Sequence, residues 1–155
     1  MKRFLIVILG LSSLICADFS RSSEGVITDT NTHLEWQDDY SDNGNLIKNG
    51  TWFQAINYCE ALDLNGNNWR LPNINELISL VDVTIHSPAI NSIFQNTFNP
   101  DFDHAYNFWS STTHNEYDSK AWYIQFDDGE QQSQDKINPY NPTYGRNVRC
   151  VRAGQ

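Results

Sequence analysis

The chain has 155 residues, which is enough for one domain and leaves little room for a second. Aromatic residues make up 13% of the chain, whereas disordered chains lack such large apolar groups. The formal net charge is −9, with ten basic residues against nineteen acidic ones. This balance argues against a nucleic-acid or heparin-like partner, because binding to polyanions depends on lysine and arginine.

The first 17 residues have the pattern of a secretory signal peptide. A basic start precedes an apolar stretch over residues 4–11 and a small-residue end at Ala17. The apolar stretch is shorter than the roughly 20 residues of a membrane-spanning helix. We expect cleavage after Ala17, which leaves a single domain over residues 18–155, no membrane insertion and a net charge of −11. The alternative is cleavage before Cys16 with lipidation of that residue. The sequence has Ser13 where a lipidation signal usually has a leucine, three residues before the cysteine.

Two cysteines remain after this cleavage, Cys59 and Cys150. Two cysteines in an exported chain predict one disulfide. The bond closes a loop of about 90 residues, worth about 4–5 kcal/mol in the chain-entropy model. Metal ligation and a catalytic thiol are the alternatives, and no nearby histidine pattern supports either of them.

A hairpin and a polar loop are predicted at the start of the mature chain. Residues 26–28 and 34–37 are strand-like and flank a turn-forming segment, which predicts a β-hairpin. Residues 38–50 are rich in Asp, Asn and Gly, which is typical of a loop.

Two helices are expected next. Thr51 and Gln54 have the spacing of a capping box, and the apolar residues after them recur at helical intervals as far as Leu62. A stop signal follows at 65–66. Asn73 is expected to cap a second helix, with an apolar stripe of Ile74, Leu77, Ile78 and Val81. Residues 90–98 are compatible with a short helix or with an ordered loop.

The C-terminal third has a strand pattern. Strands are expected at 108–112, 121–126, 130–133 and 147–152, with a tight turn at 127–129. The order of a hairpin, two helices and then several antiparallel strands predicts an α+β fold.

Five segments follow one another over about 100 residues: TWFQAINYC (51–59), WRLPNINEL (69–77), FWSST (108–112), AWYIQF (121–126) and VRCVR (148–152). Together, and in this order, they resemble a known bacterial family, the domain at the C-terminus of the Legionella collagen-like adhesin, which is also catalogued as a domain of unknown function.

The resemblance implies a variant of the C-type lectin-like fold, in which two helices pack on small antiparallel sheets with long loops. It also implies that Cys59, late in the first helix, bonds Cys150 in the last strand. The long loops would lie within 99–106, 114–120 and 134–146. The family is similar in fold to the formylglycine-generating enzymes, which place reactive cysteines in their active sites. Here the disulfide consumes both cysteines, so we expect no enzyme activity.

No dedicated metal site is evident in the sequence. The Glu-Pro-Asn, Gln-Pro-Asp and Trp-Asn-Asp motifs of calcium-dependent lectins are absent. Two acidic segments offer some of the six to eight oxygens that calcium needs, and a solvated acidic loop is the simpler interpretation of both: Asp38, Asp39 and Asp42, and Asp101, Asp103 and Asn107. We therefore expect no metal and no cofactor, and calcium remains an alternative without a supporting motif.

Charged and indole side chains at the fold-defining positions are expected to be structural. Arg70, Arg149 and Arg152 would pair with acids such as Glu76, and the tryptophans of the family motifs would lie in the core.

The candidate binding surface consists of loop residues that combine aromatic faces with hydrogen-bonding groups, which suits sugar or protein recognition. These residues are Asp101, Asp103, Tyr106, Tyr117, Tyr140, Asn141, Tyr144 and Arg146.

The resulting hypothesis is a non-catalytic, adhesin-like module that binds a glycan or an envelope or host protein. The signal peptide places it in the periplasm or on the cell surface, and the oligomeric state is left open. The alternatives are a structural or assembly protein of the cell envelope without a small ligand, and an enzyme on the related fold.

Overall fold

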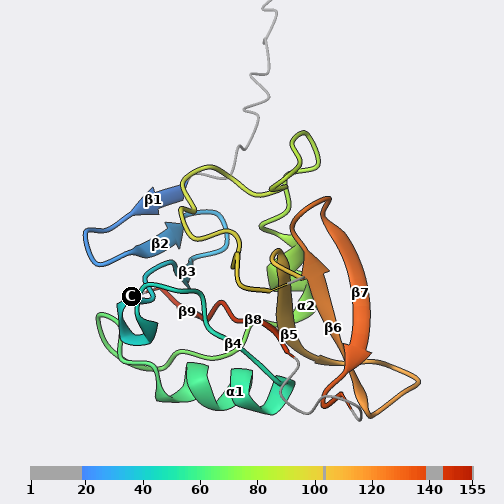
Figure 1. Cartoon of the computed structure of the whole chain (residues 1–155). Coiled ribbons are helices and arrows are strands. Elements are labelled where there is room, and N and C mark those ends of the chain that lie inside the picture. Colours follow the sequence, from blue (N-terminus) through green and yellow to red (C-terminus); the bar gives the residue numbers. More distant parts are fainter. Residues whose placement is uncertain (1–18, 103, 139–144, 155) are drawn as a thin grey trace, which may run out of the picture.

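The computed structural model describes residues 19–102, 104–138 and 145–154, and the predicted signal peptide lies outside them. Nine strands form two sheets in this part of the chain, and two α-helices pack beside them (Figure 1). The α+β prediction is confirmed.

The first sheet joins the two ends of the described chain. Its strands have the order β1-β2-β3-β9, all antiparallel: β1 (Phe19–Arg21), β2 (Val26–Asp29), β3 (Leu34–Gln37) and β9 (Val151–Ala153). The predicted hairpin is confirmed as β2 and β3. Trp36 is opposite Val151 and both are fully buried, so this sheet joins the N-terminal hairpin to the C-terminal strand.

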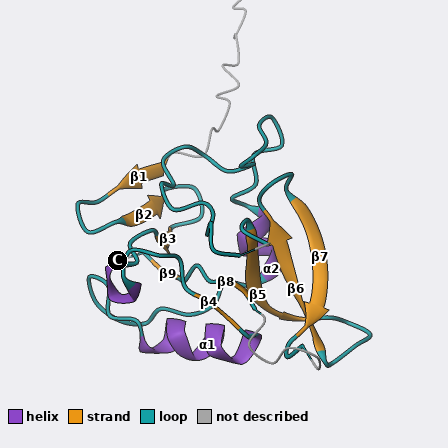
Figure 2. Cartoon of the chain, in the orientation of Figure 1, coloured by secondary structure: helices purple, strands orange, loops and turns teal. Residues whose placement is uncertain are grey.

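The second sheet carries most of the remaining strands. Their order is β4-β8-β5-β6-β7: β4 (Asn49–Gly50), β8 (Arg146–Asn147), β5 (Asn107–Thr113), β6 (Lys120–Gln125) and β7 (Glu130–Asp135). All pairs are antiparallel except β5 with β8. Polar β7 forms the outer edge, and long loops connect the elements (Figure 2).

Both helices begin at the predicted capping boxes. In α1 (Trp52–Ala61) the Thr51 hydroxyl accepts from the Gln54 N–H, and the Gln54 side chain accepts from the Thr51 N–H. Helix α1 ends earlier than the 65–66 signal predicts, because Leu62 is already extended and its N–H bonds the Cys59 carbonyl.

Helix α2 (Ile74–Ile78) is shorter than its apolar stripe predicts. Ile78, expected in the core, is 41% exposed, and Leu80 is buried beyond the helix end. The predicted pairing of Arg70 with Glu76 is confirmed, with N–O distances of 2.8 and 2.6 Å. Residues 90–98 form an ordered loop with an isolated bridge at Ile90 rather than a helix.

The predicted last strand is two strands in two sheets. β8 ends at Asn147 and β9 begins at Val151. Between them the Val148 N–H donates to the Lys48 carbonyl at 2.8 Å, and the Arg149 side chain is completely buried. Strand pairing is interrupted at these residues because the chain crosses from the second sheet to the first.

The predicted disulfide lies at this crossing. Cys59 and Cys150 are bonded and both fully buried, within a cluster that includes Trp69, Trp109 and Val148. A second buried cluster lies between the hairpin and α2, around Trp36, Leu77 and Phe108. The disulfide therefore fixes α1 against the strand-to-strand crossing.

The Asp38 carboxylate is fully buried, unlike the solvated acidic loop that the sequence suggested. It forms ion pairs with Arg21 and with Arg149, the latter at 3.2 Å. The N–H groups of Gln95 and Asn96 donate to it at 2.8 and 3.2 Å. These contacts use both carboxylate oxygens, so Asp38 has a structural role.

We predict that Asp38→Asn costs about 3–5 kcal/mol of unfolding free energy, because it leaves the buried guanidinium of Arg149 and the half-buried one of Arg21 without their counter-charge. Urea denaturation followed by tryptophan fluorescence measures the loss. Glu60→Gln, at an exposed position of α1, is the control and is expected to change stability by less than about 0.5 kcal/mol. A loss below about 1 kcal/mol for Asp38→Asn contradicts the structural role.

Removing the disulfide is expected to lower the free energy of unfolding by about 2–5 kcal/mol, because the bond restrains a long loop of the unfolded chain. The measurement is the urea midpoint of the protein with and without reductant. A Cys59→Ala, Cys150→Ala double variant is the control and should not respond to the reductant. Two titratable thiols in the folded, unreduced protein contradict the bond.

Candidate binding surface

The segment 99–107 carries the predicted residues Asp101 and Tyr106, and its last residues line a polar cleft while its first residues line a second, mixed cleft. We call this segment the 99–107 loop. Its last residue is the first residue of β5. Four predicted residues, Asp103, Tyr140, Asn141 and Tyr144, lie outside the described part of the chain.

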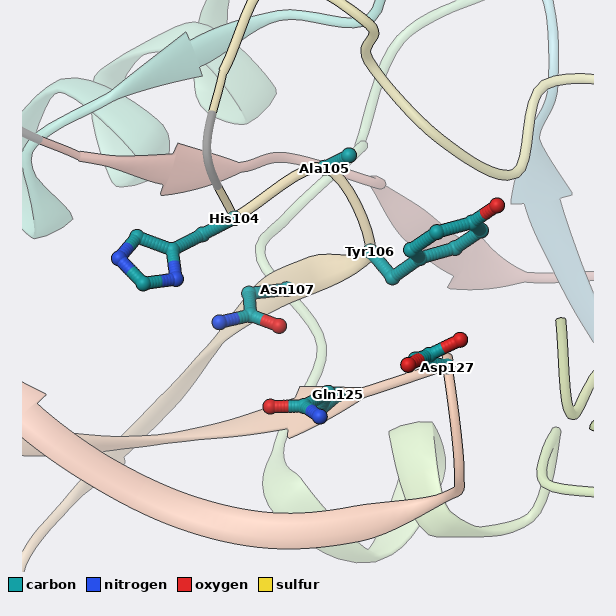
Figure 3. A pocket seen from close by; sticks show the side chains of 6 residues that line it. All are labelled: His104, Ala105, Tyr106, Asn107, Gln125 and Asp127. Atoms are coloured by element: carbon teal, nitrogen blue, oxygen red, sulfur yellow. The ribbon is translucent and has the colours of Figure 1, made fainter. Parts of the chain in front are cut away.

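The first cleft, of about 160 Å³, opens where β5 begins and β6 ends. Asn107 and Gln125 are cross-strand partners, so their side chains lie next to each other. Figure 3 shows His104 at one end of the cleft and Tyr106 with Asp127 at the other. We call this the Tyr106 cleft; it brings together two carboxamides, a carboxylate, an imidazole and a phenol ring.

The carboxylate of the Tyr106 cleft is held by a neighbouring loop. The Ser87 hydroxyl donates to Asp127 Oδ1 at 2.6 Å, and the Ser87 N–H donates to the Asp127 carbonyl at 2.7 Å. On the other wall, the Phe126 N–H donates to the Tyr106 carbonyl at 2.9 Å. These bonds fix the backbone on both sides of the cleft before any ligand arrives.

Buried asparagines hold the base of the 99–107 loop. Asn99 donates from its amide to the Ile47 carbonyl at 2.8 Å, and its oxygen accepts from the Asp101 N–H at 3.1 Å. The Ala105 carbonyl accepts from the Asn99 N–H at 2.9 Å and from the Asn147 side chain at 2.5 Å. The loop is therefore pinned to β8 and to the segment before β4.

Asp101 lies in the second cleft, of about 210 Å³, on the other side of the loop. Lys48 and Phe102 line the same cleft, and Phe102 is 44% exposed. Phe98 is also exposed and its ring centroid is 5.6 Å from that of Tyr106. Exposed aromatic rings thus accompany both clefts.

A third cleft, of about 370 Å³, continues past Lys48 along one face of α1. Tyr58 forms part of its wall and donates to Asp42 at 3.2 Å. Burial of the phenol raises the pKa of Tyr58 well above its usual value, and the negative charges of Asp42 and Asp39 act in the same direction. Tyr58 is therefore a neutral hydrogen-bonding group at neutral pH.

Two other predicted residues lie away from these clefts. Arg146 is 2% exposed, with its guanidinium 4.8 Å from the ring of Tyr123, so this side chain belongs to the interior rather than to the loop surface. Tyr117 is 54% exposed but lies in the turn between β5 and β6, at the opposite end of β5 from Tyr106.

Gln125 and Asp127 carry no site motif in the sequence. The sequence pattern predicts only a turn at Asp127 and only a strand at Gln125. The available signal was the β5–β6 hairpin itself, because polar residues at its open end must lie beside the segment that precedes β5.

No helix in the described residues is long and apolar enough to cross a membrane. Within the same residues, no three His, Cys, Asp or Glu side chains gather as a metal site would require.

Comparison with models of known protein families matches residues 25–152 to the Lcl C-terminal domain. The matched segment contains every element from β2 to the first residues of β9. This match confirms the resemblance predicted from the five sequence segments. No protein with a curated description matches the chain.

We predict that Asn99→Ala loosens the 99–107 loop and lowers the free energy of unfolding by about 1–3 kcal/mol. The reason is that the Ile47 carbonyl and the Asp101 N–H lose their hydrogen bonds to the Asn99 side chain. Hydrogen exchange should then be faster at the amides of residues 101, 102 and 104–106. Asn91→Ala is the matched control, since Asn91 caps a similar local turn by accepting from the Ile93 N–H at 3.0 Å. Unchanged exchange in the loop of Asn99→Ala refutes the anchoring role.

Proposed function

The chain belongs to the Lcl C-terminal domain family, and we propose that it is an exported, non-catalytic binding module with an adhesin-like role. Its binding surface is the 99–107 loop with the Tyr106 cleft, and its ligand is a glycan. The observation that carries this proposal is the convergence of Tyr106, Asn107, Gln125 and Asp127 on one small polar cleft.

The chemistry of the Tyr106 cleft suits sugar hydroxyl groups. Each hydroxyl both donates and accepts a hydrogen bond. The half-buried Gln125 carboxamide offers both functions and Asp127 offers acceptors, while Asn107, which also lines the cleft, is 3% exposed. The Tyr106 ring adds an apolar face for the C–H surface of a sugar ring. Because the walls are fixed beforehand, a ligand loses less free energy in ordering them.

The disulfide supports export. Cys59 and Cys150 form a buried, bonded pair, and such bonds persist in oxidising compartments such as the periplasm and the cell surface. We accordingly keep residues 1–17 as a signal peptide and residues 18–155 as the mature domain.

We further propose that the fold is a C-type lectin-like variant. The support is the disulfide from late in α1 to the segment before β9, together with the long loops before β5 and between the strands. The reactive cysteine of the related formylglycine-generating enzymes has no counterpart, because both described cysteines are bonded to each other.

The proposed ligand carries few negative charges. The described arginines are occupied: four form ion pairs with carboxylates, and Arg146 is buried. With a formal net charge of −9, the chain repels polyanions over most of its surface.

We predict that Tyr106→Ala and Asp127→Asn each weaken glycan binding about tenfold, equivalent to about 1.4 kcal/mol, because each removes a direct contact. Glycan-array screening identifies the ligand, and calorimetry on the best hit measures the affinity. Tyr117→Ala and Asp63→Asn, the latter at an exposed position that does not line the cleft, are the controls and should bind as the unmodified protein does.

Two results would argue against this proposal. If Tyr117→Ala weakens glycan binding as much as Tyr106→Ala does, the glycan site lies at the other end of β5. A silent array together with a stable complex with an envelope protein supports the structural or assembly role instead.

A further inference from the structure

The lysines of the described chain have no acidic partners. All four of its ion pairs use arginine, and no described carboxylate lies within 4.0 Å of Lys48, Lys120 or Lys136. In a protein with nearly twice as many acidic as basic residues, an unpaired cation inside a cleft identifies a place where an anion is favoured.

Lys136 is the one of these lysines that is held in a defined position beside an apolar cleft. Its ammonium group donates to the Thr113 hydroxyl at 2.8 Å and lies 4.3 Å from the centroid of the Trp52 ring. Its backbone N–H donates to the Ser119 carbonyl at 2.8 Å, and its carbonyl accepts from the backbone N–H of Trp52 at 3.1 Å. Both ends of the residue are therefore fixed.

The cleft has a volume of about 280 Å³ and lies between the start of α1 and the end of β7. Phe53 and Ile137 form apolar walls and are 49% and 50% exposed. We call this the Lys136 cleft; none of its lining residues belongs to the clefts beside the 99–107 loop.

We propose that the Lys136 cleft binds a carboxylate carried on a small apolar group. The ammonium group retains donors beyond the one given to Thr113, and these can be directed at carboxylate oxygens. The apolar part of the ligand covers Phe53 and Ile137, which are otherwise left in water.

Asp118 limits the charge of the ligand. It lines the same cleft, so a second negative charge on the ligand would face like charge. Ser119 adds a neutral hydroxyl. The volume is just below the range of about 300–1,000 Å³ that is typical of small-molecule sites, which favours a ligand with one small hydrocarbon group.

Such a carboxylate has two sources, a free hydrocarbon acid or the C-terminus of a peptide that ends in an apolar residue. The recognised group is the same in both, and an experiment can distinguish them.

The test is a titration of the purified protein, followed by NMR, with 3-phenylpropanoate and with 3-phenylpropan-1-ol. The two probes share a hydrocarbon skeleton and differ in charge. We expect saturable binding of the acid, with shifts of the Trp52 indole signal, and about fivefold weaker binding of the alcohol. Lys136→Gln should reduce acid binding to the level of the alcohol.

Lys120→Gln is the matched control. Lys120 is also on the β6–β7 hairpin and lies 5.4 Å from the Tyr117 ring centroid, but it does not line the cleft. This variant should bind the acid as the unmodified protein does, and so should Tyr106→Ala, which separates this site from the glycan site. Equal affinity for acid and alcohol overturns the proposal, as does acid binding that Lys136→Gln leaves intact.

The second part of the experiment titrates the peptide Gly-Gly-Leu with a free C-terminus and with a C-terminal amide. The amide lacks the carboxylate and is the control for the peptide. Tighter binding of the free-acid peptide than of phenylpropanoate assigns the site to peptide termini, and the reverse order assigns it to small acids. If neither acid binds in the same titrations, the proposal is refuted.

Discussion

The buried carboxylate of Asp38 is the interaction on which the rest of the structure depends. It follows β3 directly, and its partners come from the end of β1, from the loop at 95–96 and from the crossing between β8 and β9. A charge removed from water is tolerated only when ion pairs and hydrogen bonds replace its hydration. Because three separate segments supply these groups, they must reach their final positions around Asp38 together.

The neighbouring residues extend this junction. Beside Asp38, the Gln37 N–H donates to the Cys150 carbonyl, and the Cys150 N–H donates to the Gln37 side chain. Cys150 is covalently bonded to α1, and Arg149 packs its guanidinium 4.5 Å from the ring of Phe94. The disulfide, the buried ion pairs and the sheet crossing are thus one connected unit.

Elements with strong local signals were predicted well, and elements that depend on distant partners were not. The capping boxes at Thr51 and Asn73 and the β2–β3 hairpin involve residues a few positions apart, so a sequence pattern contains the whole interaction. The extent of α2 and the division of the last strand depend on tertiary contacts, which compete with local periodicity. Asp38 looked like one more acid in a polar loop because both of its arginine partners are remote in sequence.

The sequence alone determined the α+β class, the family resemblance, the disulfide and the acidity that disfavours polyanionic partners. These depend on composition and on motifs in order. Tertiary structure decided which side chains share a surface: it buried Arg146, placed Tyr117 far from Tyr106, and brought Asp127 beside Asn107. The reason is physical: the pairing of β5 with β6 and the packing of Arg146 against Tyr123 bring together residues that are apart in the sequence, so no local pattern contains these contacts.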